Sequence, residues 1–292
     1  FTYVATAEVI ALLRLKPIMV DVDPNTFNIT AAIVKAALSP KTKAVVPVHL
    51  FGQSVDMQPL IELSEKHGFY LVEDNAQAIG ADYIFDNGRR QKTGTLGHVG
   101  CTSFYPSKNL GAFGDGGALF TNDTDLAATL KKIASHGQSK RYYHDCIGVN
   151  SRLDSVQAAI LDIKLKKLDH YAQARQSLAN YYYQNLADIT ALTLPKVQPN
   201  STHVYHQFTL KVSGGQRDAL QQFLKEQGVP SMIYYPVPLQ AQKAFLGLGN
   251  TLGLELPVTE QLCKEVLSLP MHTEMAADQS QYICDTIRAF FG

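Results

Sequence analysis

A lysine, an aspartate and a serine stand where they could hold one ligand. Lys108 lies among small and apolar residues before a glycine-rich turn, where partial desolvation would lower the pKa of its amine. Asp74 ends an apolar run, and a buried acid there is costly unless it meets a cation. Ser103 lies five residues before the lysine. The set suits pyridoxal 5′-phosphate (PLP): the lysine would form a Schiff base, the aspartate would keep the pyridine nitrogen protonated and the serine would bind the phosphate.

Each of these residues also has a simpler explanation. Taken alone, Lys108 is better explained as a solvated loop lysine. Asp74 could be the N-cap of a helix beginning at residue 75 or 76, with Gln77 as a second capping residue or as a donor to a ligand oxygen. The glycines of residues 111–117 could cradle a phosphate, but they match neither GxGxxG nor GxxxxGK[ST], so a glycine-rich hairpin is the simpler interpretation.

The first half of the chain alternates short apolar runs with helical patterns. Strands are predicted over 17–22, 44–48 and 69–72, and helices over 29–38 and 57–67. This order is typical of a parallel sheet with right-handed crossovers, hence of an α/β fold. Ligands bind beyond the carboxyl ends of such strands, which directs attention to the polar residues that follow the apolar runs. These are Asp21, Asp23, His49, Glu73, Asp74 and the segment after Ser103.

The second half has a different pattern. Apolar residues at helical spacing predict one long helix from Ser151, with Asp154 and Gln157 as a capping pair. Beyond it we expect a strand over 203–212, a helix over 216–227 ended by Gly228, and a strand over 231–235. We therefore predict a large domain over 1–165 and a smaller α+β domain over 166–292.

Composition excludes several classes of protein. Lys and Arg total 26, as do Asp and Glu, and only 18% of residues are charged, which argues against nucleic acid as a partner. No apolar run approaches the roughly 18 residues of a membrane helix. The four cysteines are scattered without a CxxC pair, so we expect neither disulfides nor a metal site, and a cytoplasmic location.

Six segments, in order, resemble the DegT/DnrJ/EryC1/StrS family of nucleotide-sugar aminotransferases. They are FTYVATAE (1–8), VDVDP (20–24), EDNAQ (73–77), SFYPSKNLG (103–111), GDGGA (114–118) and GVNSRLDSVQAAIL (148–161). The resemblance continues through YPVPL (235–239) and LPMH (269–272). It implies the aspartate-aminotransferase fold of type I, with a large PLP-binding domain and a smaller C-terminal domain.

The resemblance also implies roles for single residues. Lys108 would carry the cofactor and Asp74 would face its pyridine nitrogen. Gln77 would lie beside the phenolic oxygen of the cofactor, Ser103 would bind its phosphate, and Tyr3 would stack on its ring.

Further residues are implied to act between subunits or on the substrate. Asn150 would reach the cofactor phosphate of the neighbouring subunit, and Arg152 would face the substrate there, which makes a homodimer part of the mechanism. Capping and salt-bridging at the start of the long helix is the alternative for both residues. Tyr234 and Tyr235 are expected to contact the substrate.

The implied activity is transamination of a keto sugar with glutamate as amino donor. Residues 134–144, followed by 148–152, resemble the branch that aminates UDP-2-acetamido-3-keto-hexuronic acid for surface polysaccharide. In that branch a His can stand at the position of Tyr234, so a 4-keto-6-deoxy nucleotide sugar is the alternative substrate. A sugar-nucleotide-binding or regulatory module without catalysis is the alternative class. The family's phosphate-cradling Gly-Thr-Ala or Gly-Ser-Ala turn lies upstream of the segment that begins here at Phe1, so we expect the large domain to be N-terminally incomplete.

Overall fold

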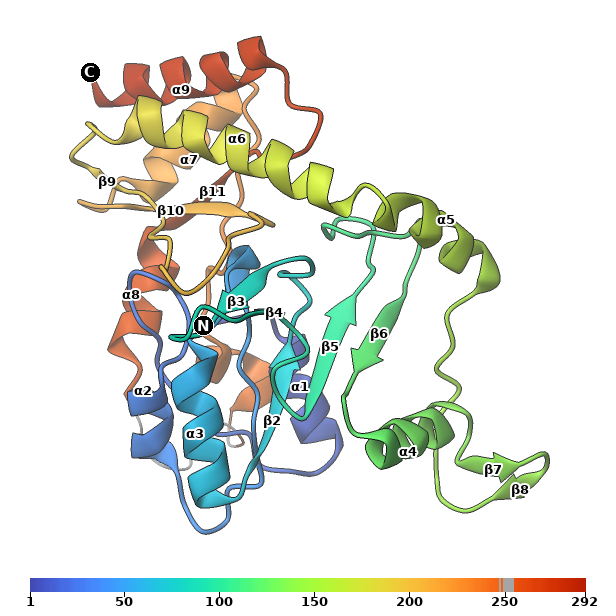
Figure 1. The fold of residues 1–292 in the computed structure, drawn as a ribbon. Coiled ribbons are helices and arrows are strands. Elements are labelled where there is room, and N and C mark those ends of the chain that lie inside the picture. Colours follow the sequence, from blue (N-terminus) through green and yellow to red (C-terminus); the bar gives the residue numbers. More distant parts are fainter. Residues whose placement is uncertain (247, 249–254) are drawn as a thin grey trace.

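A four-stranded sheet forms the centre of the first half of the chain in the computed structural model, which describes residues 1–246, 248 and 255–292 (Figure 1). Its strands, in spatial order, are β1 (Ala44–Val45), β2 (Tyr70–Asp74), β5 (Val99–Ser103) and β6 (Gly117–Phe120). The first three run parallel, and β6 runs antiparallel to β5. This arrangement confirms the predicted α/β class with a mostly parallel sheet.

Helices and two hairpins surround this sheet. The helices are α1 (Ala5–Leu12), α2 (Ala31–Ala37), α3 (Met57–His67) and α4 (Thr124–Ala134), with a 3₁₀ helix over Leu50–Gly52. The hairpins are β3 (Asp82–Ile84) with β4 (Arg90–Lys92), and β7 (Gln138–Lys140) with β8 (Tyr143–His144). In α3, Met57, Leu60 and Ser64 are buried on one face. Gly68 ends α3 with a φ of 69°, which glycine adopts without steric cost.

The second half of the chain builds a smaller antiparallel sheet covered by helices. Its strands, in spatial order, are β11 (Val266–Leu269), β10 (Phe208–Val212) and β9 (Leu192–Thr193). The helices are α5 (Ser155–Leu165), α6 (Leu168–Leu186), α7 (Arg217–Glu226), α8 (Pro257–Glu265) and α9 (Ala277–Phe291), with 3₁₀ helices over Leu239–Ala241 and Lys243–Phe245. Tyr182, Leu210, Leu220 and Ile287 belong to one core that joins α6, β10, α7 and α9. Complete burial of such a leucine contributes roughly 1.5–3 kcal/mol.

The predicted strand over 17–22 is wrong, because this segment is irregular in the structure. Its acid, Asp21, instead accepts hydrogen bonds from the first turn of the distant helix α8. The Asp21 carboxylate accepts hydrogen bonds from the backbone N–H groups of Val258 (2.9 Å) and Thr259 (2.8 Å), and from the Thr259 hydroxyl (2.7 Å). Leu256, the N-cap of α8, provides no side-chain cap, so Asp21 satisfies the first turn of α8 from outside.

The predicted single helix from Ser151 is divided into α5 and α6. The chain leaves helical geometry at Lys167, which has a φ of −109° and a ψ of 1°. This break lets Leu168 join the buried cluster that contains Phe104 and Leu161. The predicted capping pair is also wrong, since Asp154 makes no side-chain cap and Gln157 instead accepts a hydrogen bond from Phe113 N.

Two predicted strands are shorter than expected. Residues 203–207 are irregular and only the later part of the predicted strand forms β10. Within 231–235, Met232 makes a single bridge to Ser268. In both segments the chain packs against the first half of the molecule, which the local apolar pattern does not reveal. The helix over 216–227 is confirmed as α7, and Gly228 follows its end with a φ of 74°.

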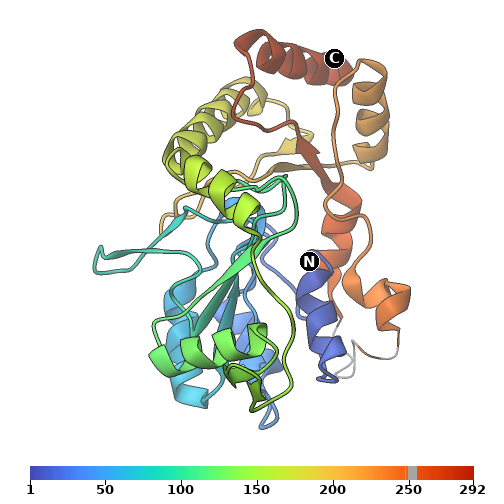
Figure 2. The ribbon, with the colours of Figure 1, turned by 90° about the vertical axis from the view of Figure 1, so that its right-hand side faces the viewer.

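The two halves of the chain meet at the edge of the larger sheet where β2 and β5 end. In Figure 1 the arrows of both strands point toward the C-terminal half, and Figure 2 shows α6 and α9 beyond that edge. Phe27 and Leu50 pack there with Leu262 and Val266 in a shared apolar cluster. Residues that follow β2 and β5 therefore lie at the boundary between the two halves, where ligands bind in such sheets.

We expect Asp21→Ala to lower the free energy of unfolding by about 1–2 kcal/mol, because the first turn of α8 loses its acceptor. Urea unfolding of the purified protein measures this change. Glu65→Ala, on the exposed side of α3, is the control and should change stability by less than about 0.5 kcal/mol. Equal effects of the two substitutions would contradict the capping role of Asp21.

Candidate active site

Asp74 is the last residue of β2 and its carboxylate is held by its own chain. Oδ2 accepts a hydrogen bond from the Thr6 hydroxyl (2.7 Å), and Oδ1 accepts one from Ala76 N (3.1 Å). No helix follows, because residues 76–80 form turns. The alternative of a helix N-cap at Asp74, with Gln77 as its capping partner, is therefore wrong. Two hydrogen bonds leave the carboxylate with capacity to accept from a ligand cation.

Lys108 lies on the loop that connects β5 to β6. Phe104 N donates to Gly116 O (2.8 Å) and Ala112 N donates to Phe104 O (2.7 Å), which closes the base of this loop. The side chain of Lys108 is half-buried. Burial lowers the pKa of Lys108, while the negative charge of Asp74 acts in the opposite direction. The charge of Asp74 therefore acts on this amine, and the half-buried position of the side chain contradicts the fully solvated alternative for this lysine.

The loop of Lys108 is anchored to the C-terminal half by residues that the sequence did not indicate. Asn109 Nδ2 donates to Val204 O (2.9 Å), and Asn109 Oδ1 lies 3.2 Å from His206 Nδ1. Burial, helped by the charge of Lys108, lowers the pKa of His206 to about 3, so its ring is neutral. Lys164 of α5 also donates to Gly111 O.

Gln77 lies between the main chain and a group of aromatic rings. Its Oε1 accepts a hydrogen bond from Phe51 N (2.6 Å), and its Nε2 donates to the Tyr235 hydroxyl (3.3 Å). The ring centroid of Tyr235 lies 6.1 Å from that of Tyr3 and 5.7 Å from that of Tyr234. Burial raises the pKa of Tyr235, whereas the ring of Tyr3 is 56% exposed. The structure therefore brings these predicted site residues together.

Ser103 is the last residue of β5 and stands opposite Gly117 in β6. Its Oγ accepts a hydrogen bond from Tyr105 N (3.2 Å), which occupies a lone pair of the oxygen and not its hydroxyl proton. A Cβ on Gly117 would lie 2.7 Å from Thr102 O, so this glycine permits close pairing of the strands. The hairpin interpretation of the glycine run agrees with this pairing.

Asn150 and Arg152 lie apart from these residues. Both are exposed, on the segment that leads from the β7–β8 hairpin to α5, and Asn150 bridges to Ser135. In Figure 1 the hairpin extends outward as an arm beyond α4. Among the residues that the structure describes, none of the ion pairs includes Arg152. The chain does not bring either residue to its own Lys108.

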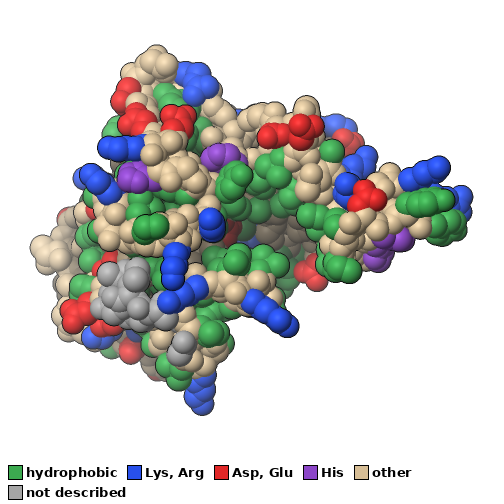
Figure 3. All heavy atoms as spheres, turned by 90° about the horizontal axis from the view of Figure 1, so that it is seen from below, with side chains coloured by type: hydrophobic (Ala, Val, Ile, Leu, Met, Phe, Trp, Pro, Cys, Tyr) green, Lys and Arg blue, Asp and Glu red, His purple; other side chains and the backbone are tan. Residues whose placement is uncertain are grey.

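The arm, α1 and α5 expose large apolar side chains. They include Val9 and Leu12 of α1 with Leu13 directly after it, Tyr142 and Tyr143 of the arm with Ile147 beyond it, and Val156, Ile163 and Leu165 of α5. Leu12 is 80% exposed and Ile147 is 96% exposed. Figure 3 shows a hollow between the arm and the rest of the molecule, with hydrophobic side chains along it. Apolar surface of this extent is typical of a site of association.

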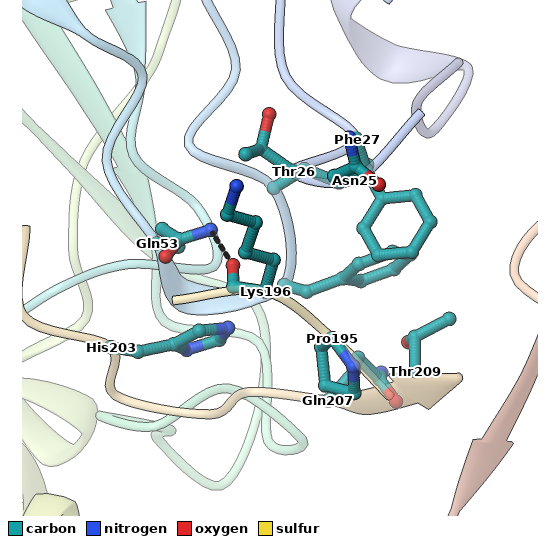
Figure 4. Close-up of a pocket in the computed structure, with 11 residues that line it drawn as sticks. Asn25, Thr26, Phe27, Gln53, Pro195, Lys196, His203, Gln207 and Thr209 are labelled. Atoms are coloured by element: carbon teal, nitrogen blue, oxygen red, sulfur yellow. Dashed lines mark hydrogen bonds between the residues drawn. The ribbon is translucent and has the colours of Figure 1, made fainter. Parts of the chain in front are cut away.

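A second hollow lies away from Lys108. Figure 4 shows it between Asn25, Thr26 and Phe27 on one side and Pro195 to Thr209 on the other, with a hydrogen bond from Gln53 Nε2 to Lys196 O (3.1 Å). Its volume of about 10 Å³ has room for one water molecule. It is too small for a cofactor.

The groups near Lys108 fit PLP. Asp74 provides a carboxylate for a pyridinium nitrogen, Ser103 a hydroxyl donor for a phosphate and Lys108 a partly desolvated amine. In the described ranges, 1–246, 248 and 255–292, no cluster of His, Cys, Asp and Glu could hold a metal ion. None of the helices in these ranges is long and apolar enough to cross a membrane.

Comparisons with known proteins identify the family of this chain. Residues 1–288 match the DegT/DnrJ/EryC1/StrS aminotransferase family. A "pleiotropic regulatory protein" of Geobacillus stearothermophilus is 46% identical, with 100% of this chain and 77% of that protein covered. A UDP-2-acetamido-2-deoxy-3-oxo-D-glucuronate aminotransferase of Pseudomonas aeruginosa is 42% identical over 97% of this chain and 76% of its own length.

A solved structure has the same fold. The crystal structure of S. venezuelae DesV in complex with a ketimine intermediate superposes with a TM-score of 0.93 and is 37% identical, covering 99% of this chain and 76% of that one. Matches of this length and identity leave one conclusion. The chain belongs to the DegT/DnrJ/EryC1/StrS family of aminotransferases.

Proposed function

We propose that this protein is a PLP-dependent aminotransferase that converts a nucleotide-linked keto sugar into an amino sugar. The observation that carries the proposal is the half-buried amine of Lys108, whose pKa is lowered by burial and raised in part by the charge of Asp74. Family membership and the aminotransferases among the relatives support it. An amine with a lowered pKa is the group that proton transfer near neutral pH requires.

Besides Lys108, four residues of the same chain would hold the cofactor. Asp74 would bind the pyridine nitrogen, Gln77 the phenolic oxygen and Ser103 the phosphate, while Tyr3 would cover the ring. When bound, PLP supplies an electron sink for the carbon whose proton is removed. Lys108, once its amine is free, would accept the proton from the α-carbon of the amino donor and later deliver a proton to the sugar carbon. Burial at the boundary of the two halves would keep water away from this amine.

We propose glutamate as amino donor and UDP-2-acetamido-3-keto-hexuronic acid as sugar substrate. The P. aeruginosa relative, named for a UDP-linked 3-oxo sugar acid, supports this choice. Tyr234 and Tyr235 would line the sugar site beside Gln77. A 4-keto-6-deoxy nucleotide sugar is the competing substrate, and turnover of each purified sugar with glutamate distinguishes them.

A regulatory or sugar-nucleotide-binding module without catalysis is the second candidate. The name of the G. stearothermophilus relative favours it. The two candidates differ in whether PLP binds covalently to Lys108, as it does in an aminotransferase. Borohydride should then fix the cofactor on Lys108. Mass spectrometry of the digested protein would detect this modification.

We also propose that the active protein is a homodimer with shared sites. Asn150 and Arg152 are exposed on the segment beside the arm and would act in the partner's site. The apolar side chains on α1, the arm and α5 would be covered by the partner. A two-fold arrangement places the same surface of each subunit at the interface.

Substitution of the two central residues tests the chemistry. Lys108→Ala should abolish turnover, because the amine that moves the proton is gone. Asp74→Asn keeps the shape of the side chain but loses its charge, so we expect a rate loss on the order of a thousandfold or more. Single-turnover kinetics with a keto sugar measure both. Substantial turnover by Lys108→Ala would refute the proposed mechanism.

The lowered pKa of Lys108 predicts a pH dependence of stability in the cofactor-free protein. Between its folded pKa and the unfolded value of 10.5, the folded state binds fewer protons than the unfolded state, so stability rises with pH in this window. Lys108→Met removes this contribution. We expect the Lys108→Met variant to have a higher free energy of unfolding than wild type near the folded pKa of Lys108. This difference should shrink as the pH approaches 10.5. Melting temperatures measure it, with the exposed Lys41→Met as control; a difference independent of pH would contradict burial of the amine.

Mixed dimers test the shared site. Combining Lys108→Ala with Arg152→Ala subunits should restore one intact site in each mixed dimer, because the other site collects both substitutions. Random reassociation makes about half of the dimers mixed, so roughly a quarter of all sites should regain activity. Activity no greater than the sum of the two separate variants would show that Arg152 acts within its own chain.

A further inference from the structure

A second acid, Glu73, lies fully buried next to Asp74 in β2. Successive side chains of a strand point to opposite faces, so Glu73 faces away from the side on which Asp74 meets Thr6. An uncompensated buried carboxylate would cost several kcal/mol. Glu73 therefore needs partners, and the structure supplies four donors within hydrogen-bond distance. They are Gly94 N (2.7 Å) and His49 Nε2 (2.8 Å) on Oε2, and Leu96 N (2.6 Å) and Gly97 N (2.6 Å) on Oε1.

These four bonds keep Glu73 charged. Burial by itself raises the pKa of this acid, but the hydrogen bond from His49 and the backbone N–H groups of Gly97 and Gly94 outweigh it, and the pKa of Glu73 is lowered. All four partners are donors. Only a side chain with two acceptor oxygens, such as the carboxylate of Glu73, can satisfy them. The negative charge is thus built into the face of β2 opposite to the candidate active site.

His49 joins Glu73 to the main chain of Asp74. Its Nδ1 accepts a hydrogen bond from Val55 N (3.0 Å), which places the ring proton on Nε2, the atom that donates to Glu73. The backbone N–H of His49 donates to Asp74 O (3.0 Å), and Asp74 N donates to Pro47 O (2.8 Å). One fully buried residue therefore touches Glu73 by its side chain and Asp74 by its main chain.

The loop held by Glu73 also fixes the residue that follows Asp74. Asn75 Nδ2 donates to Thr93 O (3.1 Å), and a Cβ on Gly94 would lie 2.8 Å from the same nitrogen. Gly94 has a φ of 82°, so both its conformation and its contact require glycine. The residues on either side of Asp74 are thus locked to one loop.

We propose that His49 and Glu73 are positioning residues that hold the carboxylate of Asp74 in place for the pyridine nitrogen of the cofactor. Neither residue needs to touch the cofactor, since their effect passes through the main chain of β2. The inference rests on the proposed function, because it assigns to Asp74 its partner there. It predicts that a substitution on the Glu73 face of β2 weakens binding of the cofactor on the Asp74 face.

Two substitutions of His49 separate its two hydrogen bonds. His49→Gln places an amide nitrogen near the position of Nε2 and keeps the donor to Glu73. His49→Asn places an amide oxygen near the position of Nδ1 and keeps the acceptor for Val55, but it leaves Glu73 one donor short. We expect His49→Asn to raise the dissociation constant of PLP by about tenfold or more, and His49→Gln to raise it less.

A matched control distinguishes positioning from general loss of stability. Tyr83→Phe removes another buried hydrogen bond of the same half, from the Tyr83 hydroxyl to Asp56 Oδ1 (2.6 Å), away from Asp74. For each cofactor-free variant we would measure the melting temperature and the dissociation constant of PLP by visible absorbance. Weaker PLP binding by His49→Asn than by Tyr83→Phe, at a similar loss of melting temperature, supports the proposal. Unchanged PLP binding by both His49 variants overturns it.

Wild-type protein provides a measurement that needs no folded variant. Nitrogen chemical shifts of the His49 ring should show a neutral ring with its proton on Nε2, and these shifts should change when PLP is added. Shifts that do not respond to PLP overturn the positioning role. If the wild type binds no PLP at all, the proposed function itself fails, which is a different result from binding that is insensitive to His49.

Discussion

The partly buried carboxylate of Asp74 at the end of β2, between the two halves of the chain, is the constraint on which the rest of the site depends. A carboxylate at the boundary between two packed halves is stable only if donors and positive charge are brought to it. Thr6 from α1 and Ala76 from the following turn provide two donors, and the charge of Asp74 acts on the amine of Lys108. These groups come from distant parts of the sequence, so the order of the sheet must be fixed before they can meet.

Strand β2 carries charge on both faces, with a different use for each. On one face Asp74 keeps capacity for a ligand, because its own chain supplies only part of the bonds it can accept. On the other face Glu73 is fully bonded and cannot act on a ligand. Because side chains of a strand alternate between its two faces, the adjacent acids have different roles: Asp74 faces the candidate active site, and Glu73 fixes the loop on the other face. Central parallel strands are usually apolar on both faces, which makes this strand an exception with a structural reason.

Local patterns in the sequence predicted the class of the fold and the loop of Lys108, since short motifs determine turns and strand ends. They failed where a distant contact decides the local structure. Residues 17–22 look like a strand, but Asp21 is engaged by α8, more than two hundred residues later. The break at Lys167 follows from the burial of Leu168. Thr6 and His206 had no local signal, whereas strand alternation alone distinguishes Glu73 from Asp74.

The ties between the lysine loop and the C-terminal half have a mechanical consequence. Asn109 is bonded to Val204 and His206, and Gly111 is bonded to Lys164, so the loop is fastened directly after Lys108 to segments outside the large sheet. A rotation of the C-terminal half relative to that sheet would carry the loop with it, while Asp74 would stay with β2. Closure of the two halves around a substrate would therefore change the separation of the amine and the acid, and couple substrate capture directly to the geometry of proton transfer.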